Sequence, residues 1–164
     1  MNSKDAIKGS LKATQDMLNW YLSDLADADI LVRPVPNANH IAWQLGHLIG
    51  TENGMFSSVL PNTAPVALPA GFAEQHATKT ASQDPPKGFL SKADYVALFT
   101  KTRETTIGAV DKMSDADLDK PTPGDMAKWA PTLAALLILT ANHTMMHAGQ
   151  FTVVRRKLGK PVLF

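Results

Sequence analysis

Two histidines one helical turn apart are the residues of this sequence best suited to chemistry. His143 and His147 lie in the segment PTLAALLILTANHTMMHAGQFTVVRRKL. On a helix, residues four apart share one face, with Cβ atoms about 6 Å apart. Metal sites use this HxxxH spacing. A divalent metal would satisfy two polar rings on an apolar face, and hydrogen bonds within the core would do so as well. The motif alone leaves both interpretations open.

The helix that carries this pair is predicted over Pro131–Leu158. Pro131 suits the first turn, where its missing N–H costs nothing, and Gly159 followed by Pro161 is a stop signal. The basic residues 155–157 complement the helix dipole at the last turn, which explains them more simply than nucleic-acid binding does.

A third histidine, His47, falls in a second helix predicted over His40–Leu60. His47 could be a third metal ligand, or it could bond to a carbonyl or carboxylate across the bundle. His40 is predicted as a capping or rim residue. Glu52 is not named as a ligand, because five residues along a helix from His47 it points about 140° away.

Glycine recurs at every fourth position of this second helix, at Gly46, Gly50 and Gly54. Each glycine costs about 1 kcal/mol of helix propensity relative to alanine. This spacing predicts that another part of the chain, or a ligand, approaches the helix closely.

Two further helices are predicted, over Ser3–Ala26 and Ser91–Met113. In the latter, Arg103 and Glu104 are interpreted as a solvated charge pair. A short capped turn is expected from Ser114. No strand and no internal repeat is apparent.

The connection Pro61–Leu90 contains five prolines and no helical or strand period. A connection of about 30 residues is long for a compact domain, and such loops tend to be functional lids or crossovers. It can run the full length of a bundle, so the helices that it joins need not be antiparallel. His76 in this segment is predicted to be exposed.

The composition limits the number of domains and the class of protein further. The 164 residues predict a single domain over 1–164, and 45% hydrophobic with 19% charged residues is a globular balance. A net charge of +1 does not mark a nucleic-acid binder. The absence of cysteine excludes disulfides, thiolate ligands and a cysteine nucleophile. No secretion signal and no apolar run of membrane-spanning length is seen, so a cytoplasmic protein without membrane contact is expected.

Three segments together resemble the DinB-like superfamily, also known as YfiT-like metal-dependent enzymes. These segments are HIAWQLGHLIGTENGMF, SDADLDKPTP and NHTMMHAGQFTVVRRKLGKPVLF. The resemblance implies an all-α four-helix bundle running up, down, down, up, with the long crossover between the second and third long helices. It also implies a divalent nickel, zinc or iron ion held by His47, His143 and His147.

The resemblance further implies chemistry on a small-molecule substrate. Related proteins are transferases or isomerases that use low-molecular-weight thiols, so the metal is expected to activate a thiol or water for transfer or hydrolysis. Gln44, Thr51, Asn142 and Gln150 are candidates to orient the ligands, with Gln150 preferred because it lies three residues beyond His147 on the same face. No buried acidic residue is expected beside the histidines, and no general acid or base is identified.

The sequence leaves two alternatives to an enzyme open. One is a non-catalytic metal-binding, sensing or stress-related protein, and the other is a bundle with structural histidines that serves association. A homodimer is expected on the apolar residues Trp20, Trp43, Trp129, Met145–Met146 and Leu163–Phe164.

Overall fold

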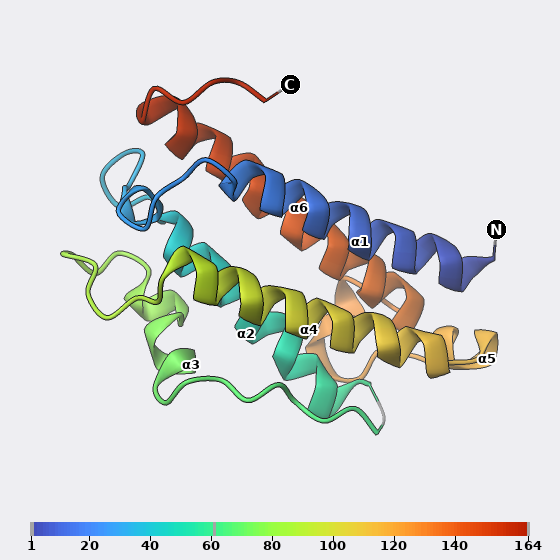
Figure 1. Ribbon diagram of the computed structural model, residues 1–164. Coiled ribbons are helices and arrows are strands. Elements are labelled where there is room, and N and C mark those ends of the chain that lie inside the picture. Colours follow the sequence, from blue (N-terminus) through green and yellow to red (C-terminus); the bar gives the residue numbers. More distant parts are fainter. Residues whose placement is uncertain (1, 61, 164) are drawn as a thin grey trace.

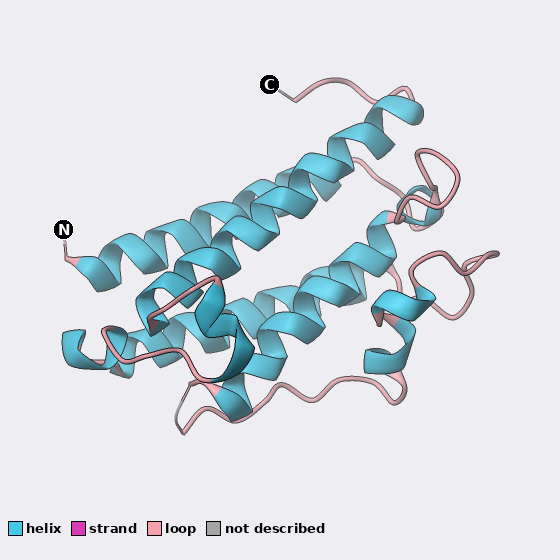
Figure 2. Ribbon diagram, turned by 180° about the vertical axis from the view of Figure 1, so that it is seen from behind, coloured by secondary structure: helices cyan, strands magenta, loops and turns pink. Residues whose placement is uncertain are grey.

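The computed structural model describes residues 2–60 and 62–163, and within these ranges the regular elements are all helices (Figures 1 and 2). The four long helices are α1 (Ser3–Leu22), α2 (Ile41–Ser58), α4 (Lys92–Lys112) and α6 (Leu133–Lys157). The short ones are η1 (Asp29–Leu31), α3 (Phe72–Gln75), η2 (Thr78–Thr80), α5 (Asp115–Leu118) and η3 (Gly124–Lys128). The predicted all-α class is confirmed.

Side-chain caps set where the helices begin. Nδ1 of His40 accepts the backbone N–H of Trp43, so His40 caps α2 as predicted. Ser114 and Asp117 form a full capping box at α5. α6 begins two residues later than predicted: Thr132 is its cap, whereas Pro131 lies outside it and accepts a backbone hydrogen bond from Thr122.

The long helices run up, down, down, up. In Figure 1, α1 and α6 point the same way, while α2 and α4 both point the opposite way. α1 packs against α6 and α4, and α2 packs against α4 and α6. The connection from α2 to α4 returns along the edge of the bundle through α3, which lets two neighbouring helices be parallel (Figure 1). The predicted topology and crossover are confirmed.

The core consists of two apolar clusters, one toward each end of the bundle. One cluster includes Leu18 of α1, Phe99 of α4 and Phe151 of α6. The other includes Leu11 of α1 and Phe56 of α2. Between the two clusters, every long helix contributes at least one buried polar residue. These residues include Thr14, Glu52, Arg103, Thr106 and Thr144.

Arg103 is the centre of this polar layer, so its prediction as one half of a solvated pair with Glu104 is wrong. Arg103 is 0% exposed, whereas Glu104 is exposed. The Arg103 guanidinium donates to both oxygens of Glu52, with Nε–Oε1 and Nη2–Oε2 distances of 2.9 Å. It also donates to Leu11 O at 2.7 Å and Thr144 Oγ1 at 2.8 Å, so one side chain joins all four long helices.

His76 is also buried, at 4% exposure, which contradicts its prediction as an exposed loop residue. Its Nδ1 lies 2.7 Å from Phe72 O, an acceptor, so Nδ1 carries the proton. Nε2 then accepts from the Tyr95 hydroxyl at 2.7 Å. The ring lies against Gly46, where an added Cβ would be 2.0 Å from His76 Cδ2. The crossover is therefore anchored on α2, one residue before His47.

The close approach predicted from the glycine spacing occurs at one position of the three. Gly46 has no room for a side chain, because the His76 ring occupies the space. A Cβ at Gly50 or at Gly54 would meet nothing within 4 Å. Neither of these two glycines is required for packing within the described chain.

Candidate metal centre

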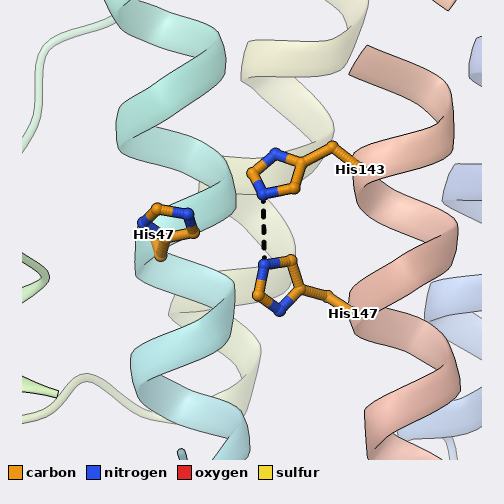
Figure 3. A group of neighbouring side chains, drawn as sticks. All are labelled: His47, His143 and His147. Atoms are coloured by element: carbon orange, nitrogen blue, oxygen red, sulfur yellow. Dashed lines mark hydrogen bonds between the residues drawn. The ribbon is translucent and has the colours of Figure 1, made fainter. Parts of the chain in front are cut away.

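Three histidines from two helices meet between α2 and α6. His47 is carried by α2, and His143 and His147 lie one turn apart on α6 with their rings directed toward the His47 ring (Figure 3). One ring nitrogen of each lies within 4.8 Å of those of the other two. His147 is buried and the other two are half-buried, so the group borders solvent.

The two α6 imidazoles already have the spacing of metal ligands. Their Nε2 atoms are 3.2 Å apart. Two nitrogens bound at 2.0–2.1 Å to one tetrahedral ion would be about 3.3 Å apart. Since the largest separation in the group is 4.8 Å, His47 is the side chain that would have to move inward.

Gln44 fixes the tautomer of His147. The Gln44 amide donates through Nε2 to Asn39 O at 2.9 Å, and a carbonyl can only accept. Its Oε1 therefore faces His147, whose Nδ1 donates to it at 2.8 Å. With the proton on Nδ1, the His147 Nε2 lone pair points at His143, as a metal ligand requires.

Trp43 supports the third imidazole. The indole of Trp43 stacks on the His47 ring with a centroid separation of 5.0 Å and an angle of 8° between planes. Trp43 is 4% exposed, so the prediction that it contributes to a surface for dimerisation is wrong. A buried aromatic face against the ring restricts its rotation about the Cβ–Cγ bond.

All three imidazoles are held in the neutral form. Burial lowers the pKa of His47, and burial together with the nearby His47 lowers the pKa of His143. The pKa of His147 falls to about 3, first through burial and then through the two neighbouring histidines. Neutral imidazole is the form that binds a metal ion, so at neutral pH protons do not compete for these nitrogens.

The preferred orienting residue in the sequence prediction, Gln150, is exposed, and the side chain that accepts the hydrogen bond from His147 is Gln44. Sequence spacing favoured a residue on the same helix as His147, whereas the partner is supplied by the facing helix. Gln44 lies three residues before His47 on α2, and residues three apart share one face of a helix. This spacing was the signal in the sequence that could have placed Gln44 beside the histidines.

A buried acid does lie near the group, contrary to expectation. Glu52 borders a small cavity together with His143 and Thr144. Its carboxylate is engaged by Arg103 and by the Thr106 hydroxyl at 2.6 Å. The negative charge of Glu52 is thus balanced by Arg103 within the bundle, and Glu52 lies outside the three-histidine group.

Of the other residues predicted for a dimer surface, Trp129 is 81% exposed and Met146 is 55% exposed. Trp20 and Met145 are about 41% exposed. Leu163 is half-buried against the core, and Phe164 lies outside the described residues.

The fold and the site define a class: an up-down-down-up four-helix bundle with three imidazoles gathered between two of its helices. The chain belongs to the DinB superfamily, whose sequence profile matches residues 10–151. The family resemblance found in the sequence is thereby confirmed.

Two solved structures share the fold. One is a conserved protein from Enterococcus faecalis, with a TM-score of 0.70 and 18% identity over 98% of this chain and 99% of the other. The second is YfiT from Bacillus subtilis, described as a probable metal-dependent hydrolase with an unusual four-helix bundle topology. It has a TM-score of 0.68 and 17% identity over 96% of this chain and 89% of YfiT. No curated protein matches the sequence.

In the part of the chain that the structure describes, each helix is too short or too polar to cross a bilayer.

Proposed function

We propose that this protein is a metal-dependent enzyme acting on a small molecule, with one divalent ion held by His47, His143 and His147. The observation that carries the proposal is the convergence of three neutral imidazoles at the edge of the bundle. One of these, His147, is oriented by a buried amide. The likeness to YfiT, described as a probable metal-dependent hydrolase, supports the same class.

The donor set fits a catalytic ion better than a structural one. Structural zinc sites are closed by four protein ligands, whereas three ligands leave a position for water or substrate. Imidazole suits zinc, nickel and iron alike, so the donor set selects among metals only weakly. When bound, such an ion would supply Lewis acidity and lower the pKa of a coordinated water or thiol.

The residues of the chain prepare this site before any ligand arrives. Gln44 keeps the His147 lone pair directed at the group, and Trp43 holds the plane of the His47 ring. Since the sequence has no cysteine, a thiol nucleophile would be a low-molecular-weight thiol from outside the chain. The proposed reaction is transfer or hydrolysis with an activated thiol or water.

Metal analysis of untagged protein tests the ligand set. About one divalent ion per chain is expected, and His143→Ala and His147→Ala should each lose it, because two imidazoles rarely hold a metal tightly. Gln44→Leu should weaken metal affinity about 10- to 100-fold without changing the fold. His40→Asn, which alters a buried histidine outside the group, is the matched control and should retain the ion. Full occupancy in both alanine variants would show that the assignment is wrong.

Thiol binding separates an enzyme from a binding module. Titration of the cobalt-substituted protein with small thiols should produce sulfur-to-metal charge-transfer absorption, because thiolate is a strong ligand for such ions. His47→Ala should abolish the signal. A metal-loaded protein that binds neither thiols nor other small ligands would be a non-catalytic metal-binding protein.

We also propose a homodimer, on the exposed apolar residues Trp129, Met145 and Met146. A monomer mass by light scattering at micromolar concentration would contradict it.

A further inference from the structure

A cavity of about 430 Å³ opens beside the three histidines. It lies between α2 and α6 and is bordered by η3. Its lining residues are Thr51, Met55, Met126, Leu136, Leu139, Thr140, Asn142, His143 and Met146. His143 belongs both to this lining and to the three-histidine group, so the cavity adjoins the candidate metal centre at this residue.

The lining has the character of a site for an uncharged group. Three methionines and two leucines supply most of the wall, and no Asp, Glu, Lys or Arg contributes to it. The Thr140 hydroxyl, a polar group of the wall, already donates to Leu136 O at 2.9 Å and contacts Met55 Sδ at 3.5 Å. A charged group placed here would lose hydration without meeting a residue of opposite charge in the wall.

The size fits a small organic molecule. Ligand pockets usually measure about 300–1,000 Å³, and a sealed apolar cavity of about 150 Å³ is sufficient for benzene. Methionine side chains are flexible and polarizable, so a wall containing Met55, Met126 and Met146 can adapt to substituents of differing shape.

A larger cavity, of about 720 Å³, lies elsewhere, between the end of α2 and the start of α6. Its lining includes Phe56, Pro65 and Leu133 but none of the three histidines. Volume alone would favour this cavity, whereas contact with the candidate metal centre favours the smaller one.

From these observations we infer that the 430 Å³ cavity is the substrate pocket, and that the substrate carries an uncharged alkyl or aryl group joined to a polar group that reaches the histidines. This inference rests on the proposed function. It specifies the class of molecule on which the metal centre acts: one with an uncharged apolar body and a metal-binding end, as opposed to a sugar or a polyanion.

A chain-length series of metal-binding probes tests the pocket. Hydroxamic acids from two to eight carbons are titrated into zinc-loaded protein that carries ¹³C-methyl methionine. Of the seven methionines in the sequence, three line the cavity, so hexanohydroxamate should shift the methyl signals of Met55, Met126 and Met146. The signals of Met113 and Met145 should stay in place. Each methylene that enters the pocket should tighten binding about fourfold, the equivalent of ~0.8 kcal/mol.

Two neighbouring methionines provide the matched control. Met145 and Met146 are both exposed and adjacent on α6, yet only Met146 lines the cavity. Met146→Ser should lower the affinity for hexanohydroxamate at least about fourfold relative to acetohydroxamate, whereas Met145→Ser should leave that ratio unchanged. An equal loss of this affinity ratio in the two variants would overturn the inference. The tighter binding of the longer probe would then come from contact with the apolar surface in general and not from the cavity.

The failures of the inference and of the proposed function have different signatures. If zinc binds and acetohydroxamate binds as tightly as hexanohydroxamate, the pocket is wrong while the metal centre stands. If no zinc binds, the metal centre is wrong. In that case 1-hexanol added to the metal-free protein still tests the pocket, since it should shift the same three methyl signals. The absence of those shifts would overturn the pocket as well.

Discussion

Removal of Glu52 provides the most direct test of how the bundle is held together. Glu52→Leu would leave the Arg103 guanidinium, which is 0% exposed, without its counter-ion in the centre of the protein. A guanidinium cannot lose its charge by deprotonation at any accessible pH. Loss of one partner of a buried ion pair costs about 3–5 kcal/mol. Since a domain has only about 5–15 kcal/mol of stability in total, the variant should be barely folded.

The double variant Glu52→Leu with Arg103→Met should recover most of this loss. Both charges are then gone, and replacement of a buried pair by apolar residues is often neutral or stabilising. The threonines of the layer remain satisfied. Thr14 and Thr144 already donate to a carbonyl of their own helix, at 3.0 and 3.2 Å, and the Thr106 hydroxyl can donate to Thr102 O, 3.2 Å away, once Glu52 is gone. The recovery should therefore exceed half of the single-variant loss.

The assay is equilibrium unfolding in urea at pH 7, followed by circular dichroism, with a chelator present so that metal binding does not contribute. Glu104→Leu is the control, since Glu104 is exposed beside Arg103 and should change stability by no more than about 0.5 kcal/mol. A loss below about 1 kcal/mol for Glu52→Leu would mean that water reaches Arg103 in solution. A double variant less stable than Glu52→Leu alone would refute the argument equally.

Two further predictions concern α2 and the residue that caps it. Gly46→Ala should destabilise the fold by about 1–3 kcal/mol, because the added Cβ would lie 2.0 Å from the His76 ring, whereas Gly54→Ala should stabilise it by about 1 kcal/mol since nothing lies within 4 Å. Urea unfolding should show a lower free energy of unfolding for the Gly46 variant and a higher one for the Gly54 variant. Equal changes in the two variants would contradict the close packing at Gly46. His40 has its pKa lowered to about 4, first by burial and then by Arg33. Between pH 6.5 and 4, His40 therefore binds a proton in the unfolded chain but not in the folded chain. Because of this difference, the free energy of unfolding decreases by about 1.4 kcal/mol for each unit by which the pH is lowered. His40→Asn, which preserves a capping side chain, should reduce the pH slope of the metal-free protein by that amount; an unchanged slope would rule out this role for His40.

The sequence predicted the elements of this fold because they depend on local signals. Apolar periodicity, capping residues and Gly159 identified the four long helices, and the HxxxH spacing identified the α6 pair. The direction of the helices came from the family resemblance together with the length of the crossover. No residue pattern within one helix specifies which neighbour it will have.

The contacts that the sequence did not predict are long-range ones between polar groups. Arg103 and Glu52 are 51 positions apart, and His76 meets Gly46 across 30 positions, so neither pairing has a local signature. Gln44 was considered as an orienting residue, but its role depends on the facing helix, 103 positions away at His147. A buried polar residue looks like a surface residue in a sequence until its partner is known.

The order of the helices along the chain has a consequence for synthesis. α6 is made after the other long helices, and it carries two of the three histidines. A ribosome-bound chain that has not yet released α6 holds His47 alone, and one imidazole binds a metal weakly. Until α6 docks against α1 and α2, the apolar faces of those helices also lack their cover. An ion that needs all three histidines as ligands could therefore bind only once α6 has docked and the bundle has closed.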